Sequence, residues 1–452
     1  MNDPKDSRMN EAEKKKDSDS ANLYRAIGRS MVGRYAVYGT NLLSLMLLAR
    51  VFTPATFGTI AALSVLLIFF QLMVEVGIGP AVINLNTLSH RDRDGLFGLL
   101  IFIGLLLAIL FLLIGPVVEE FYSSPRLLEI VPLISISLVF YSAMVVPNAL
   151  LLRDQKFLNI SAAGVMAEVA STGATLILKN FLDPLHALAC KGPISAAANF
   201  FLLYQFSSST EFGRPRIGAK FSAIKPLLKF SVYQFAFNFV NYFSRNSDSI
   251  LVGKYFGVAS LGVYEKAYQL MRYPLLVLTF AMTPAIQPTV RKFASDLSKV
   301  EEIHRNFSFK LSLAGGFAGC AMYFLAEPAV LVIFGSQWMG IAPIVKIFAI
   351  AIPVQVVMAA SGSFFQATQR ADLLLSSGVM SSLVMISSIF YGIYRGEILT
   401  LSWMIVAALH LNFVQIYWLM YSKIYKKSAL PFVIKMLPVF FVVCALVLAS
   451  VL

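Results

Sequence analysis

Charged residues are scarce in this sequence. Asp, Glu, Lys and Arg make up 13% of its 452 residues, and 58% of the residues are hydrophobic. A soluble domain is about half apolar and a quarter charged, so a water-soluble core cannot hide this much apolar surface. The mean hydropathy is +0.74, and long apolar runs recur along the whole chain. Each run can cross a bilayer as a helix, which needs roughly 20 residues. The sequence therefore predicts an all-α, polytopic membrane protein.

Cysteine and histidine are scarce too. The three cysteines lie far apart in apolar runs, and the four histidines are scattered. None has the spacing of a metal site. We therefore expect no catalytic centre, no metal and no cofactor, and nothing supports a nucleic-acid partner. The residues concerned are Cys190, Cys320, Cys444, His90, His186, His304 and His410.

The apolar runs divide the chain into two sets. Residues 1–28 are polar without a signal-peptide core and are predicted to form a disordered cytoplasmic tail. Six spans over 29–206 form an N-terminal bundle, and a polar cytoplasmic linker follows at 207–226. Six more spans over 227–421 form a C-terminal bundle, and one additional helix covers 430–451. The spans lie near 29–51, 57–85, 95–117, 127–151, 158–178, 184–206, 227–252, 258–290, 306–334, 341–366, 373–394, 398–421 and 430–451.

Lys and Arg predict the orientation. With the N-terminus in the cytoplasm, the inner loops carry most of the basic residues and the outer loops few. The net charge of +13 is therefore mainly a topology signal. The outer loops, such as 53–56 and 335–340, are too short for an extracytoplasmic catalytic domain.

Two pairs of segments indicate an internal repeat. RVFTPATFGTI (50–60) resembles KYFGVASLGVY (254–264) at an offset of 204 residues, and QKFLNISAAGVMA (155–167) resembles QRADLLLSSGVMS (369–381) at an offset of 214. Both pairs fall at equivalent turns, so the halves are predicted to be six-helix repeats of the same orientation. Two such bundles with a site between them are a transporter layout.

Several ionisable residues fall inside the spans, where an unpaired charge costs at least ~2.5–3.5 kcal/mol. In the seventh span, polar residues recur at intervals of four and three, which places them on one helical face opposite phenylalanines. Such a stripe indicates a helix lining water or substrate. The alternative is purely structural, with Arg245 and Asp248 as an i,i+3 pair. The ionisable residues are Glu75, Glu168, Lys191, Arg245, Asp248, Glu265, Lys266, Arg272 and Glu327, and the stripe is Gln234, Asn238, Asn241, Arg245 and Asp248.

A cavity with several arginines and lysines suits an anionic substrate such as a diphosphate, which guanidinium binds bidentately. We predict that one set of side chains binds substrate: Arg245, Asp248, Asn241, Asn238, Lys266, Arg272 and Lys191. A second set is predicted as proton or sodium sites, with hydrogen-bonded core carboxyls as the alternative: Glu75, Glu168 and Glu265.

The run NYFSRNSDSILVGKYFGVASLGVYEKAYQLMRYPL (241–275) resembles the polysaccharide-export flippases of the Wzx type, especially their colanic-acid-exporter-like branch. Arg245, Asp248, Gly253, Leu261-Gly262-Val263-Tyr264 and Tyr268-Gln269-Leu270 carry the resemblance. EVGIGPAVI (75–83) and EPAVLVIFGSQW (327–338) are weaker matches, and the similarity runs from about 30 to 420. Glu75 stands where the family often has Asp, and Lys191 is outside the family pattern. Family members have 12 or 14 spans, against 13 counted here.

The resemblance implies a function and a location. The family moves undecaprenyl-diphosphate-linked oligosaccharides across the bacterial inner membrane by alternating access, alongside the polysaccharide polymerase machinery. It belongs to a superfamily with multidrug and toxin extruders and lipid II flippases. The competing hypotheses are a cation-coupled exporter of small cations, which favours an acidic cavity, and a membrane enzyme of glycan assembly, which needs paired acids on a sizeable loop. The placement of Arg245 and Arg272 favours an anion.

Overall fold

The computed structural model describes residues 31–75, 89–219, 246–280 and 296–451, with a few isolated residues outside these ranges. Within them the regular structure is helical, with no strand. The predicted tail at 1–28 and the start of the seventh span lie almost entirely outside the described residues.

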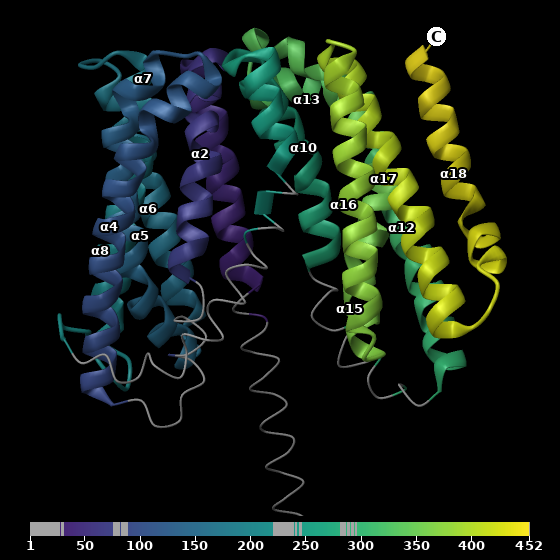
Figure 1. Ribbon diagram of the computed structural model, residues 1–452, viewed down its shortest axis with the longest axis horizontal. Helices are drawn as coiled ribbons and strands as arrows, with labels where there is room; N and C mark the ends of the chain where they lie inside the picture. The colour runs from purple at the N-terminus through teal and green to yellow at the C-terminus, as the bar shows by residue number, and fades with distance from the viewer. Residues whose placement is uncertain are drawn as a thin grey trace, which may run out of the picture. The chain divides into compact units, whose positions relative to one another are not determined.

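The described chain forms two compact units, and each is treated by itself (Figure 1). Unit 1 comprises Met1–Leu48, Leu66–Glu119 and Pro125–Phe239, and unit 2 comprises Ala49–Val65, Glu120–Ser124 and Val240–Leu452. The compact units therefore do not follow a single cut at the linker. The end of the first predicted span and the start of the second are grouped with the second half of the sequence.

Unit 1 is built from α4 (His90–Tyr122), α5 (Arg126–Arg153), α6 (Phe157–Leu178), α7 (Pro184–Ala189) and α8 (Lys191–Ser207), with parts of a helix over 31–51 and of α2 (Pro54–Glu75). Helices α5, α6 and α8 pack against one another. Their buried side chains are apolar or small, among them Leu151, Ala163 and Leu203. Small residues allow close approach of helices in a membrane.

Unit 2 contains helices from both halves of the sequence, and large aromatic side chains fill its core. Trp338, Tyr264, Phe348 and Phe364 are among its fully buried residues. Besides a helix over 246–256, the elements are α10 (Val258–Phe280), α12 (Leu297–Phe324), α13 (Ala326–Ile333), η2 (Ser336–Ile341), α14 (Ala342–Ala349), α15 (Ile352–Ala367), α16 (Ala371–Tyr394), α17 (Ile398–Met420), a π-helical turn η3 (Tyr421–Tyr425) and α18 (Leu430–Val451).

Helix starts follow local capping rules. Asp296 precedes α12 and accepts hydrogen bonds from the Ser298 and Lys299 amides, both at 3.1 Å. Asp183 does the same for α7 with the Leu185 amide at 3.1 Å, and Pro184 takes the first helical position. These side chains satisfy amides that no helical carbonyl can reach. The cap at Asp296 starts α12 nine residues before the predicted span at 306.

Two predicted spans are bent at a break, and a third, 184–206, is interrupted at Cys190, whose backbone stays helical. A proline follows each of the three helix ends. Helix α7 ends at Ala189, α12 at Phe324 and α14 at Ala349. Each end lies four residues before a proline, Pro193, Pro328 and Pro353 respectively, which cannot donate to that carbonyl. The chain bends by 72° between α12 and α13, and by 59° between the η2–α14 segment and α15. The predicted spans 306–334 and 341–366 are therefore not straight helices.

The described residues contain seven helices long and apolar enough to cross a membrane, or up to nine if each bent pair is one span. This confirms a polytopic helical membrane protein. The predicted total of 13 stays a prediction, because parts of the first, second, seventh and eighth spans are outside the described residues. The described helix bounds otherwise follow the predicted spans closely, for example Ile398–Met420 against 398–421.

The internal repeat is visible in backbone geometry. At the turns matched by an offset of 214, Gln155 and Gln369 have φ of 56° and 57°. The next amide donates to the carbonyl five residues back in both cases, from Lys156 to Leu151 at 2.8 Å and from Arg370 to Phe365 at 2.9 Å. Both turns thus end a helix with the same left-handed cap.

The offset of 204 produces a reciprocal contact within unit 2. A Cβ on Gly58 would lie 1.7 Å from the Val258 carbonyl oxygen, and a Cβ on Gly262 would lie 2.2 Å from the Pro54 carbonyl oxygen. Gly58 matches Gly262, and Pro54 matches Val258. Equivalent residues of α2 and α10 therefore meet across a local two-fold relation, and only glycine permits this backbone contact.

The first part of the predicted linker lies against unit 1. The Asp94 carboxylate at the start of α4 accepts the Arg216 amide at 2.8 Å, and the Asp94 carbonyl accepts the Gly218 amide at 3.0 Å. The Glu211 amide donates to Asp154 at 2.8 Å. Residues 208–219 are thus held at the end of unit 1 that is predicted to face the cytoplasm.

Candidate functional site

Part of the predicted stripe falls outside the described residues. These are Asn238, Asn241 and Arg245, and the Glu75 side chain is likewise not described. The pairing of Arg245 with Asp248 therefore stays a prediction. The remaining candidates lie on helices whose geometry is described.

Asp248 is buried, with 8% of its surface exposed. Its carboxylate accepts a hydrogen bond of 2.7 Å from the Tyr264 hydroxyl, and Tyr264 is itself fully buried. Tyr264 is in the Leu-Gly-x-Tyr motif, so that motif holds the aspartate of the preceding helix. Next to it, the Ser249 hydroxyl donates to the Glu265 carboxylate. The structure therefore brings Asp248 and Glu265 together and ties each to a hydroxyl.

Two cations lie on α10 six residues apart, which places them about 120° apart around the helix. The Lys266 ammonium lies 4.5 Å from the centre of the Phe57 ring and 3.2 Å from the Gln269 side-chain oxygen. The Arg272 guanidinium lies 4.6 Å from the centre of the Tyr268 ring, and the arginine is exposed. A cation over an aromatic face keeps its charge without a carboxylate. Among the described residues, Arg272 forms no ion pair with a carboxylate.

Glu168 and Lys191 form an ion pair within unit 1. The Lys191 ammonium lies 2.8 Å and 3.0 Å from the two Glu168 carboxylate oxygens. The sequence assigned Glu168 to ion coupling and Lys191 to substrate, but it could not show that they are partners. They lie 23 residues apart on different helices, so helical spacing carries no signal for their contact.

The motif EPAVLVIFGSQW has a structural role in unit 2. The Trp338 indole and the Gln337 amide both donate to the Ala49 carbonyl, at 2.7 Å and 2.6 Å. Arg50 in turn donates to the Val332 carbonyl at 2.8 Å. The motif therefore satisfies carbonyls at the end of the helix over 31–51, which have no helical donor.

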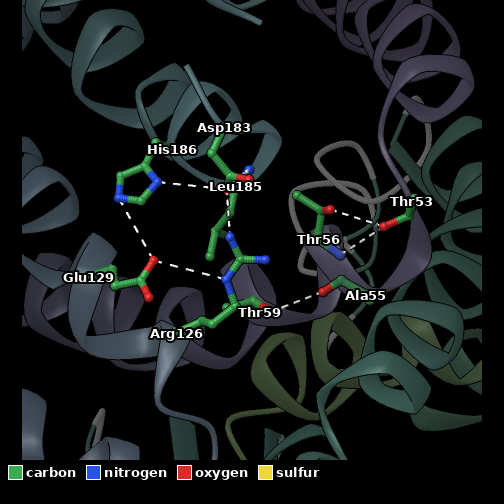
Figure 2. Close-up of polar contacts among 9 residues, drawn as sticks. All are labelled: Thr53, Ala55, Thr56, Thr59, Arg126, Glu129, Asp183, Leu185 and His186. Atoms are coloured by element: carbon green, nitrogen blue, oxygen red, sulfur yellow. Dashed lines mark hydrogen bonds and ion pairs between the residues drawn. The ribbon is translucent and has the colours of Figure 1, made fainter.

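Sequence reasoning missed polar networks at the helix ends that are predicted to face outward (Figure 2). In unit 1, Arg126 lies 2.7 Å from Asp183, and His186 lies 3.7 Å from Asp183 and 3.9 Å from Glu129. In unit 2, Thr53 accepts from the Thr56 amide at 3.3 Å and caps α2. Only the Thr53 cap, directly before Pro54, has a signal in the sequence.

It also missed a buried cluster at the other end of unit 2. Glu301 is 5% exposed and lies 3.1 Å from Arg305 and 3.3 Å from Lys427. Tyr421 lies between this carboxylate and His304, whose Nδ1 is 3.4 Å from the Tyr421 hydroxyl. Only the Glu301–Arg305 spacing of four residues is readable in the sequence.

The described residues contain no group of three or more His, Cys, Asp or Glu side chains that could hold a metal ion. The three cysteines have no disulfide partner. What the described helices do bring together is the buried Asp248 and the half-buried Glu265, each tied to a hydroxyl, and two cations stacked on aromatic rings.

Known proteins match both the sequence and the fold. The chain is 25% identical over 355 residues to the teichuronic acid biosynthesis protein TuaB of Bacillus subtilis (strain 168), covering 78% of this chain and 73% of that protein. It is 22% identical over 366 residues to the lipopolysaccharide biosynthesis protein WzxC of Escherichia coli (strain K12), covering 80% and 73%.

Solved structures with this fold are membrane transporters. The lipid II flippase MurJ in an inward closed conformation superposes with a TM-score of 0.69 at 12% identity, covering 92% of this chain and 97% of that chain. An inward-facing multidrug resistance MATE family transporter superposes with a TM-score of 0.59 at 14% identity, covering 90% and 94%. At these identities the likeness concerns the fold alone.

The expected resemblance is confirmed by a family match. The match begins near the end of the helix over 31–51 and ends at the start of α14. The polysaccharide biosynthesis protein family matches residues 47–343, and this chain belongs to that family.

Proposed function

We propose that this protein is a flippase that moves a lipid-linked oligosaccharide across the membrane for polysaccharide export. Membership of the polysaccharide biosynthesis protein family supports this proposal, as do the names of TuaB and WzxC and the MurJ fold. The lipid carrier that we propose is undecaprenyl diphosphate. The mechanism that we propose is alternating access, with no covalent catalysis.

One observation carries the choice of an anionic substrate. Arg272 presents an exposed guanidinium about 21 Å along α10, at ~1.5 Å per residue from Val258. A cation at such a depth in a membrane helix needs a cavity or a counter-ion. A guanidinium binds a phosphate bidentately, so a diphosphate is a suitable partner for it.

The neighbouring acids are each hydrogen-bonded to a hydroxyl group. Tyr264 holds Asp248 and Ser249 holds Glu265. Lys266 lies one residue after Glu265 and adds a second cation on the same helix, stacked on Phe57. The exposed Arg272 guanidinium is therefore the observation that supports an anionic substrate.

The alternative is a cation-coupled exporter of small cationic molecules. The fold does not separate the two functions, because MurJ and the MATE transporter both share it. A cationic substrate would require exposed carboxylates where the described part of α10 exposes Arg272. The charge placement therefore favours the flippase.

We further propose that the protein lies in the bacterial inner membrane with its N-terminus in the cytoplasm, and that it works beside the polysaccharide polymerase. The distribution of Lys and Arg supports this orientation. Arg245, Asn241 and Asn238 are proposed to bind the substrate together with Arg272 and Lys266.

The experiment is lipid analysis of a strain lacking this gene. We expect an undecaprenyl-diphosphate oligosaccharide to accumulate in the cytoplasmic leaflet. Wild type should relieve the accumulation, and Arg245→Ala and Arg272→Ala should not, although both variants still insert. Arg395→Ala is the matched control, because Arg395 is exposed at the end of α16, and it should complement fully. Unchanged lipid pools with altered sensitivity to cationic drugs would instead indicate the small-molecule exporter.

A further inference from the structure

Unit 1 places one ion pair inside helices that are otherwise uncharged. Glu168 is the single charged residue of α6, and Lys191 is the single charged residue of α8. Their side chains are 13% and 24% exposed. Replacing a buried ion pair by apolar residues is often neutral or stabilising, so packing alone does not explain why these helices carry charges.

The pair lies next to a helix break. Helix α7 ends at Ala189, whose carbonyl loses its donor because Pro193 has no amide hydrogen, and Lys191 is the first residue of α8. The interruption therefore leaves one backbone carbonyl without its helical donor two residues before Lys191.

The surroundings of Glu168 are polar but contain little other charge. On α5, Tyr141 interacts electrostatically with Glu168 and shares a hydrogen bond with Gln71 of α2. On the helix over 31–51, the described contacts with α6 are uncharged and pair Gly33 with Ser161, Val37 with Gly164, and Ser44 with Thr172. On α7 and α8, the neutral thiol of Cys190 lies beside Lys191. Among the described residues, Lys191 is the cation within ion-pair distance of Glu168.

We propose that the Glu168–Lys191 pair is a proton-binding site whose occupancy controls an anion site on Lys191. A proton from the aqueous phase adds to a Glu168 carboxylate oxygen, and the carboxylate loses its charge. The Lys191 ammonium then loses the carboxylate that it pairs with among the described residues, and it takes an anionic phosphate. When the phosphate leaves, Glu168 returns the proton to water and the pair forms again.

The identity of the phosphate rests on the proposed function, in which the diphosphate of the lipid carrier supplies it. Proton and phosphate binding are then linked, and each raises the affinity for the other by the same factor. For one linked proton, phosphate affinity falls by up to about tenfold per pH unit as the pH rises. Phosphate affinity is higher at low pH because the protonated form of Glu168 is the one that releases Lys191.

The first test uses the full-length protein in lipid nanodiscs without any ligand. Infrared difference spectroscopy during a pH titration should show a protonated carboxyl band that is lost in Glu168→Gln. Glu327→Gln is the control, because Glu327 forms a comparable pair with Lys346 at 2.6 Å but is 58% exposed, and it should keep the band. The absence of a Glu168-dependent band across the stable pH range of the protein would overturn the proposal.

The second test measures binding of undecaprenyl diphosphate by the same samples as a function of pH. Wild type and Glu327→Gln should lose affinity as the pH rises. At every pH, Glu168→Gln should bind the lipid with the affinity that wild type has at low pH. Lys191→Met should bind the lipid at least tenfold more weakly than wild type. A Glu168→Gln variant with the wild-type pH dependence would overturn the coupling.

A charge exchange separates this role from simple helix stabilisation. Glu168→Lys with Lys191→Glu restores an ion pair, so a structural role predicts full recovery of lipid binding. The proposal predicts normal folding but persistent loss of the pH response. If wild type binds no undecaprenyl diphosphate while the carboxyl band is present, the proposed function fails and the proton site stands. If binding is normal and does not shift the band, the coupling fails and the proposed function stands.

Discussion

At the scale of single residues, the acids and the cations of unit 2 contact different kinds of partner. Tyr264 and Ser249 hold the two acids of unit 2 by hydrogen bonds, whereas Lys266 and Arg272 rest on aromatic rings. A ring face stabilises a cation without neutralising it. The exposed Arg272 guanidinium can therefore bind an anion, as the proposed function requires.

Tyr264→Phe should destabilise the protein by about 1–3 kcal/mol, because the buried Asp248 carboxylate loses a donor. Thermal unfolding in detergent measures this as a lower midpoint. Tyr394→Phe is the control, because Tyr394 is 86% exposed. Adding Asp248→Asn to Tyr264→Phe should recover part of the loss, and an unchanged midpoint in the single variant would argue against the hydrogen bond.

Arg272→Lys should bind undecaprenyl diphosphate about tenfold more weakly than wild type. Lysine keeps the charge but loses the planar fork that contacts two phosphate oxygens, and tenfold corresponds to about 1.4 kcal/mol. Arg272→Ala should lose more. Titration of the purified protein with the lipid measures both, and equal binding by wild type and Arg272→Ala would rule out a substrate contact.

At the scale of elements, helix positions were predictable and helix partners were not. The lengths of the apolar runs predicted the bounds of α16 and α17 to within two residues, because an apolar run is a local property of the chain. Pro193, Pro328 and Pro353 are visible in the sequence, but so are Pro116, Pro132 and Pro147, which lie inside continuous helices. Whether a proline ends a helix depends on neighbours that can satisfy the open carbonyl.

The candidate site shows the same limit. The charged residues were recognisable because charge is rare in apolar spans, so Glu168, Lys191 and Arg272 could be selected from sequence alone. Their partners lie on other helices, and Tyr264 appeared in the sequence only as part of a motif. Contacts between helices depend on packing that no single-helix pattern encodes.

Gly58→Ala should push α2 away from α10, because the added Cβ would lie 1.7 Å from the Val258 carbonyl oxygen. Overpacking of this kind costs about 1–3 kcal/mol, and Gly262→Ala should cost a similar amount because the contact is reciprocal. Thermal unfolding and export of polysaccharide in cells measure the effect.

Gly362→Ala is the control for the two glycine variants, because a Cβ there meets nothing within 4 Å. It should behave as wild type. If all three variants behaved alike, the close contact between α2 and α10 would be absent in the membrane.

At the scale of the whole molecule, the two halves of the sequence share one compact unit. Ala49–Val65 belongs to unit 2 together with Val240–Leu452. The motif around Trp338 binds the end of the helix over 31–51. The Gly58–Gly262 contact then joins the following helix, α2, to α10. Chain connectivity across the linker is therefore not what holds Ala49–Val65 in place.

Separate expression of residues 1–219 and 220–452 in one cell should give two fragments that copurify and restore part of the export. Gly58→Leu in the first fragment should reduce copurification severalfold, because the larger side chain blocks the glycine contact. Affinity purification through a tag on one fragment measures this. Recovery of the tagged fragment alone would contradict a unit assembled from both halves.

The reciprocal contact of Gly58 and Gly262 also bears on ancestry. A surface in which each residue meets the equivalent of its own neighbour is self-complementary, as in an isologous dimer. Two identical half-length chains could close the same contact without a linker. We infer that duplication and fusion fixed an existing homodimer in one polypeptide, after which each copy was able to change alone. Glu168 and Lys191 in unit 1, and Arg272 in unit 2, are then specialisations that a symmetric dimer would have had to carry twice.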